Sequence, residues 1–75
     1  MKRQGGKIEN WFLNTTMFPG YIVVCGEVHG DEKWPDGMAI RTSAVVKLDL
    51  EANTVETMNT IYTLGKQQEN FSKQG

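Results

Sequence analysis

Short apolar stretches separated by turn-forming residues run along this chain, and none repeats its apolar positions with the period of a helix. The clearest stretch covers residues 21–28, where β-branched side chains dominate between a Pro-Gly pair and a His-Gly pair. This composition predicts a strand. Apolar side chains fall on both of its faces, so we expect the strand to lie in the interior of a sheet.

Four further stretches have the composition or the alternation of strands: residues 8–13, 38–43, 44–50 and 55–64. Residues 44–50 alternate apolar and polar side chains in the manner of a half-buried strand. Turn-forming residues, such as the Pro-Asp-Gly sequence at 35–37, separate the stretches. Together they predict an all-β fold: a small antiparallel meander of about five strands that forms a sheet or a partly open barrel.

The distribution of charge indicates how the 75 residues are organised. Residues 1–7 carry three bases and no acid, whereas residues 8–65 carry three bases against eight acids. Residues 66–75 contain one large apolar side chain, Phe71, and a segment with so little to bury is typical of a disordered tail. We therefore expect a flexible basic N-terminus over 1–7, a single β-domain over 8–65 and a disordered C-terminal tail over 66–75.

The same composition excludes several classes of partner. The body of the chain is acidic, whereas proteins that bind duplex nucleic acid usually carry a basic face, so nucleic acid is not an expected partner. No apolar run approaches the roughly 18 residues of a membrane span. The basic start is not followed by the apolar core of a signal peptide. We therefore expect a cytoplasmic protein that does not bind membranes.

A chain of this length builds only a small hydrophobic core. Cys25 is its one cysteine, so no internal disulfide can support the fold. We therefore expect the protein to gain stability by self-association as a homo-oligomer. Trp11, Phe12 and Tyr21 are expected to fill the core or a subunit interface.

The residues that could carry catalysis do not form a recognisable set. His29 is the only histidine and lies in a predicted loop, and Cys25 lies among valines in a predicted strand. Asp31, Glu32 and Asp36 lack the spacing of a cation-binding loop, which favours a solvated acidic loop. The glycines match neither a Walker motif nor a dinucleotide-binding fingerprint. We therefore expect no enzymatic activity, no bound metal and no cofactor.

One group of residues could bind a small anion. Arg41 has a guanidinium fork suited to phosphate or carboxylate, and the hydroxyls of Thr42 and Ser43 add donors. Trp34 could stack on a planar base, and the turn that contains Asp36 would return it toward the strand of Arg41. The same residues also fit a structural interpretation, with Trp34 in the core or an interface, Arg41 paired with Asp36, and Ser43 at a bulge.

Part of the chain resembles small, mostly uncharacterised β proteins encoded by phages and prophages. The resemblance rests on a Gly-x-Val segment at 26–31, an aromatic-x-Asp-Gly turn at 34–37, an Ile-x-Thr-Ser strand at 40–45, and an Ile-x-Asn-Trp segment at 8–11. It implies an origin in a mobile element. Small phage proteins of this size often act against host defence, by blocking an effector or by sequestering its signal molecule, and the resemblance brings no catalytic residue with it.

These observations favour a non-enzymatic phage-type binding protein. We expect it to sequester a small anionic or nucleotide-like ligand in the host cytosol, with a possible counter-defence role. Subunit interfaces can supply the concavity that so small a body lacks, so we expect the ligand to lie between subunits of the homo-oligomer. Two alternatives remain: a protein-binding inhibitor that masks a host defence effector, and a structural or accessory phage protein without a ligand.

Overall fold

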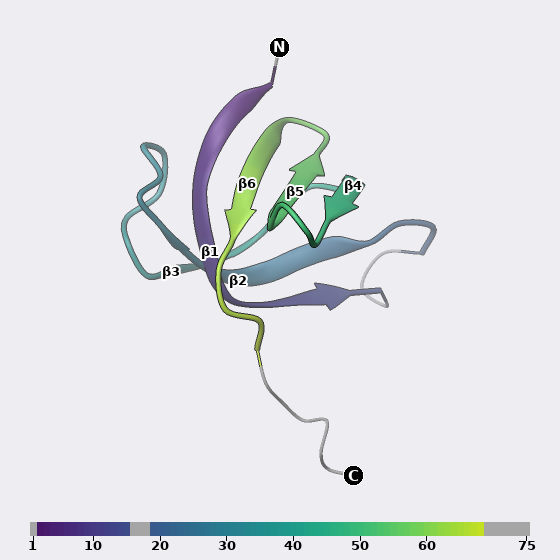
Figure 1. Cartoon of the computed structure of the whole chain (residues 1–75), viewed down its shortest axis with the longest axis horizontal. Helices are drawn as coiled ribbons and strands as arrows, with labels where there is room; N and C mark the ends of the chain where they lie inside the picture. Colours follow the sequence, from purple (N-terminus) through teal and green to yellow (C-terminus); the bar gives the residue numbers. More distant parts are fainter. Residues whose placement is uncertain (1, 16–18, 69–75) are drawn as a thin grey trace, which may run out of the picture.

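Residues 2–15 and 19–68 are described by the computed structural model of the chain, and they form one mixed sheet that does not close (Figure 1). The all-β prediction is confirmed, because the described residues form strands, turns and loops without a helix. In chain order the strands are β1 (Arg3–Asn14), β2 (Val23–His29), β3 (Met38–Arg41), β4 (Val45–Asp49), β5 (Thr54–Thr57) and β6 (Thr60–Leu64).

The sheet consists of two three-stranded antiparallel meanders placed side by side. Its order is β3-β2-β1-β6-β5-β4, and β1 pairs with β6 in parallel while every other pair is antiparallel. The chain must therefore cross from β3 at one edge to β4 at the other. The prediction of a single antiparallel meander is wrong in this respect, because the first and last strands pair at the centre of the sheet.

The strand predicted over residues 55–64 is in fact two strands, so the sheet has six strands where about five were expected. A turn at Met58 and Asn59 separates β5 from β6. The hydroxyl of Thr57, which is buried, donates to the carbonyl of Thr60 at 3.0 Å and accepts from its amide at 3.3 Å. These hydrogen bonds let a turn form without glycine or proline, since the side chain satisfies the backbone groups at the turn.

The first residues of the chain belong to the sheet. Arg3 to Ile8 pair with β6, so the predicted domain boundary at residue 8 lies inside β1. The guanidinium of Arg3 reaches the loop after β2 and binds the carboxylate of Asp31, with 3.0 Å between Nη1 and Oδ1. Asp31 is buried, so the interpretation of this loop as uniformly solvated is wrong at that residue. A basic residue assigned to a flexible end is thus part of the folded domain.

The segment after β6 also contacts the sheet. The Trp11 amide donates to the carbonyl of Lys66 at 3.2 Å, and the Gln68 amide donates to the carbonyl of Trp11 at 2.8 Å. These bonds place residues 66–68 alongside the second half of β1. The remainder of the predicted disordered tail, residues 69–75, lies outside the described residues.

A β-bulge in β1 decides which of its side chains face the core. The register against β2 shifts between Glu9 and Phe12, and Asn10 has a φ of 53°. An extra residue at a bulge reverses the inward and outward alternation of a strand and bends it. Ile8 and Trp11 are therefore both buried although they are three residues apart. Figure 1 shows the change of direction along β1.

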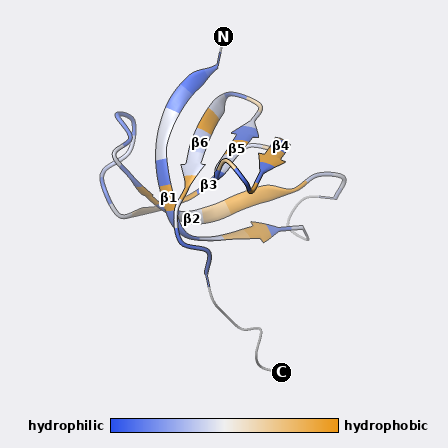
Figure 2. Cartoon of the chain, viewed as in Figure 1, coloured by the Kyte–Doolittle hydropathy of each residue, from blue (hydrophilic) through white to orange (hydrophobic). Residues whose placement is uncertain are grey.

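One apolar cluster fills the inside of the curved sheet. Half-buried side chains from β3, β4 and the loop before β3 pack against it. Hydrophobic residues fill the first part of β2 (Figure 2), and β2 lies between β1 and β3 as expected for an interior strand. The buried members of the cluster are Ile8, Trp11, Val24, Val28, Val55, Tyr62 and Leu64.

Candidate functional site

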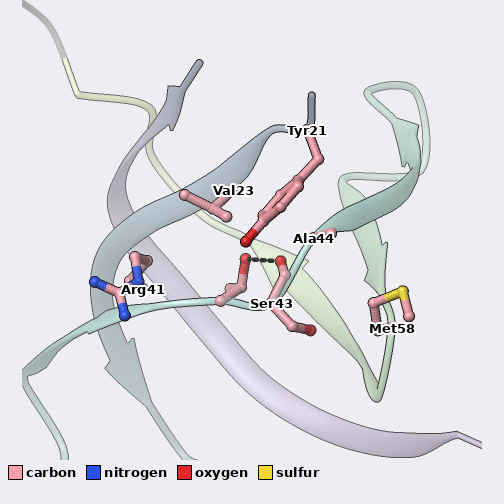
Figure 3. A pocket seen from close by; sticks show the side chains of 7 residues that line it. Tyr21, Val23, Arg41, Ser43, Ala44 and Met58 are labelled. Atoms are coloured by element: carbon pink, nitrogen blue, oxygen red, sulfur yellow. Dashed lines mark hydrogen bonds between the residues drawn. The ribbon is translucent and has the colours of Figure 1, made fainter. Parts of the chain in front are cut away.

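A groove of about 520 Å³ lies where β2, the crossover from β3 to β4, and the β5–β6 turn meet (Figure 3). Its volume falls within the range of about 300–1,000 Å³ that is typical of small-molecule sites. Three of its residues are Arg41, Thr42 and Ser43, which the sequence singles out. The full lining is Tyr21, Val23, Arg41, Thr42, Ser43, Ala44 and Met58.

Hydrogen bonds of the crossover backbone hold the groove in place. The Thr42 amide donates to the carbonyl of Val24 at 2.9 Å, and the Val45 amide donates to the carbonyl of Ile22 at 2.8 Å. From the other side, the Met58 amide donates to the carbonyl of Ala44 at 3.1 Å. The crossover is therefore attached both to β2 and to the β5–β6 turn, which brings the two halves of the sheet together at the groove.

The hydroxyl of Thr42 serves this attachment. It accepts a hydrogen bond from the buried Val24 amide at 3.0 Å and donates to the carbonyl of Ser43 at 2.8 Å, the dashed line in Figure 3. Thr42 is itself buried. A hydroxyl already engaged as donor and acceptor has little left for a ligand. Thr42 therefore acts as a positioning residue for the groove, and Arg41 and Ser43 on either side of it are the exposed polar groups.

Replacing Thr42 with valine is expected to lower the free energy of unfolding by about 1–3 kcal/mol, because the Val24 amide would remain buried without its acceptor. The two side chains have nearly the same shape, so packing changes little. Urea denaturation followed by circular dichroism measures the effect, and Thr42→Ser, which keeps the hydroxyl, is the matched control. Equal stability of the two variants would contradict this role for the hydroxyl.

The lining combines one cation with apolar and hydroxyl groups and contains no carboxylate. This is unusual for a body in which acids outnumber bases. Figure 3 shows Arg41 at one end of the lining, Met58 at the other, and the ring of Tyr21 across the middle. Tyr21 and Met58 are 43% and 60% exposed, so both present large side chains to a ligand. The groove is thus suited to a small anion that also carries a flat apolar surface.

Two of the five residues expected at the site lie elsewhere. Trp34 and Asp36 precede β3, whereas Arg41 ends it, and neither residue lines the groove. Trp34 packs against the core cluster, with the Lys33 Nζ 5.2 Å from the centre of its ring. The carboxylate of Asp36 accepts a hydrogen bond from the Gly30 amide at 2.8 Å. For Trp34, the core position matches the structural interpretation.

Two residues of the groove were not expected there. Tyr21 was assigned to packing, and Met58 was not singled out at all. Tyr21 follows a Pro-Gly pair immediately before a strand, and Met58 is a large apolar residue within a turn. The Pro-Gly pair marks a turn beside Tyr21, and this signal could have indicated an exposed role for it. No such signal marks Met58, because the sequence predicts residues 55–64 as one strand.

The residues with catalytic potential are not arranged as a reactive pair. Cys25 and His29 lie four residues apart on β2, a separation of roughly 13 Å along a strand. Within residues 2–15 and 19–68, no group of three or more histidine, cysteine, aspartate or glutamate side chains could hold a metal ion. Nor does that part of the chain contain a helix with the length and apolarity needed to cross a membrane. Comparisons with protein-family models, with curated proteins and with solved structures find no match to this chain.

Proposed function

We propose that this protein is a non-enzymatic binding protein that sequesters a small anionic, nucleotide-like ligand in the groove at Arg41. The observation that carries the proposal is the groove's lining, which combines Arg41 at one end with the ring of Tyr21 across the middle and contains no carboxylate. A negatively charged ligand meets no like charge there. The counter-defence role and the phage origin remain part of the proposal through the resemblance of residues 8–11 and 26–45 to small phage proteins.

Each exposed group of the lining has a counterpart in a nucleotide. The fork of Arg41, at one end of the lining in Figure 3, can bind two phosphate oxygens at once. The hydroxyl of Ser43 lies apart from it and can donate to another part of the ligand. The ring of Tyr21 offers a face on which a base can stack. The thioether of Met58 is flexible and polarisable, so it can pack against the rings of different bases and does not select one of them. A second subunit of a homo-oligomer could cover the groove from its open side.

Replacing Arg41 with alanine is expected to weaken nucleotide binding by about 10- to 100-fold, the contribution of a charge-assisted hydrogen bond. The residue is exposed at the end of an edge strand, so the melting temperature should hardly change. Calorimetric titration with a panel of nucleoside mono-, di- and triphosphates measures the affinity, and differential scanning fluorimetry measures the stability.

Lys47→Ala is the matched control, because Lys47 is an exposed base on β4 that does not line the groove. The nucleotide affinity of this variant should equal that of the unchanged protein. A fall in melting temperature on replacing Arg41, with unchanged binding, would make Arg41 a structural residue and remove the proposed site. If no anion of the panel binds, the alternative of an inhibitor that masks a host effector takes precedence. Val46 and Leu50, large exposed apolar residues at the β4 edge, favour that alternative.

A further inference from the structure

A second hollow of about 280 Å³ lies on the meander formed by β1, β2 and β3. It differs from the groove in its chemistry, because it holds a carboxylate and two side-chain amides and no base. Its lining includes Asn10, Phe12, Cys25, Glu27, Ala39 and Gln68.

The groove and the second hollow are neighbours on one face of the sheet. Cys25 of the hollow and Arg41 of the groove are directly paired across β2 and β3. Paired residues of antiparallel strands point to the same face, about 4.5–5.5 Å apart. Glu27 lies two residues beyond Cys25 and Val23 two residues before it, so both share that face. One molecule extended along β2 would therefore pass from one hollow to the other across Arg41.

The exposed carboxylate of Glu27 offers the second hollow a hydrogen-bond acceptor for a ligand. Glu27 is exposed, and the Nδ2 of Asn10 lies 3.4 Å from its Oε1. Asn10 has a φ of 53°, a left-handed conformation that asparagine adopts more readily than most residues, and it belongs to a β-bulge, a feature often found next to binding sites. The exposed ring of Phe12 supplies a flat apolar surface beside the carboxylate. Ribose hydroxyls and base amino groups are donors that suit such a carboxylate.

We infer that the two hollows bind a single ligand with two nucleoside units joined by phosphate, a dinucleotide. One base stacks on Tyr21 in the groove, the bridging phosphate binds Arg41 at the shared pair, and the second nucleoside donates hydrogen bonds to Glu27. This inference rests on the proposed function and narrows it. A mononucleotide fills the groove alone, whereas a dinucleotide also reaches the carboxylate.

The test compares the affinities of the four nucleoside 5′-monophosphates with those of the sixteen 5′-phosphorylated ribodinucleotides, measured by calorimetric titration. At least one dinucleotide is expected to bind about tenfold or more tightly than both of its component mononucleotides. Glu27→Ala should lower the affinity for that dinucleotide to the affinity measured for a mononucleotide. It should leave the affinity for mononucleotides unchanged. Arg41→Ala should weaken both ligands. Glu32→Ala, which removes an exposed acid outside both hollows, is the control and should change neither affinity.

A second variant tests the hollow by filling it. Ala39→Tyr adds a ring at an exposed position of an edge strand, where β-propensity favours tyrosine, and it should have the same effect as Glu27→Ala. If a mononucleotide binds as tightly as every dinucleotide, the inference fails and the proposed function stands. If dinucleotide affinity survives both Glu27→Ala and Ala39→Tyr, the inference fails as well. If no nucleotide of either set binds, the proposed function itself fails.

Discussion

Replacing Asp31 with alanine is expected to lower the free energy of unfolding by about 3 kcal/mol at neutral pH, because the buried Gly6 amide loses its acceptor and the half-buried Arg3 loses its partner. A chain of 75 residues has a total stability of roughly 4–11 kcal/mol. The variant is therefore expected to melt far below the unchanged protein or to be unfolded at room temperature. Thermal and urea denaturation followed by circular dichroism measure the loss.

The size of this effect follows from four hydrogen bonds to one buried carboxylate. Oδ1 accepts from the Arg3 guanidinium at 3.0 Å and from the Lys33 amide at 2.8 Å, and Oδ2 accepts from the Gly6 amide at 2.9 Å and from Arg3 again at 3.4 Å. The side chain has no exposed surface. Alanine would leave the buried Gly6 amide without an acceptor, which is costly in itself. Glu32→Ala, at the exposed neighbouring residue, should change stability by less than about 0.5 kcal/mol.

The ion pair also predicts a dependence on pH. Burial by itself would raise the pKa of the Asp31 carboxyl, but the Arg3 guanidinium and the amides of Lys33 and Gly6 outweigh it and hold the pKa below its usual value of 3.8. Stabilisation from a lowered pKa is complete above that usual value and is lost as the pH falls through the pKa of the folded state. The stability difference between the unchanged protein and Asp31→Asn should therefore shrink as the pH falls below 3.8. A difference that stays constant with pH would contradict the ion-pair explanation.

Replacing Gly26 with alanine is expected to cost about 3 kcal/mol, at the upper end of the range for overpacking a core. A Cβ at this position would lie 2.5 Å from the Cγ2 of Ile8, 2.9 Å from the carbonyl oxygen of Glu9 and 3.1 Å from the Cα of Trp11. Two of these three atoms belong to the backbone of β1, which cannot move without disturbing the bulge. Either β1 and β2 separate or the bulge shifts, and both changes expose the core.

The control for this prediction is Cys25→Ala on the neighbouring position of β2, whose side chain is on the opposite face and only half-buried. It should cost less than about 1 kcal/mol. Near-ultraviolet circular dichroism adds a specific readout, since Trp11 is buried beside the bulge and its Nε1 donates to the carbonyl of Gly65 at 3.0 Å. An alanine at position 26 that leaves both stability and the Trp11 signal unchanged would show that the bulge tolerates a Cβ.

Local chemistry explains why much of the fold was predictable. Residues 23–29 form an interior strand because their β-branched residues favour a strand, and apolar side chains on both of its faces favour a position between two other strands. The turn at 35–37 also appears between strands as expected. The turn at Met58 and Asn59 was missed because the hydroxyl of Thr57 stabilises it, and threonine is equally common inside strands.

At the candidate site, the sequence predicted which neighbouring residues of the chain lie together, but it did not predict which distant residues join them. Arg41, Thr42 and Ser43 line the groove together because they are consecutive residues at the end of β3 and just after it. Trp34, expected beside them, packs against the core, because a large ring gains more from burial than from the rim of a groove. Met58 joins the lining only because the crossover hydrogen-bonds to a turn fourteen residues further along.

The sequence by itself determined the all-β class, the positions of most strands and turns, and the cluster of polar groups after β3, since each of these depends on neighbouring residues and on the alternation of side chains. Only the tertiary structure decided that β1 and β6 pair in parallel, that Arg3 stabilises a buried Asp31, and that the groove and the second hollow share one face. Each of these depends on contacts between residues far apart in the chain. Such contacts form because the whole sheet buries one core, and the local pattern of apolar and polar residues does not predict them.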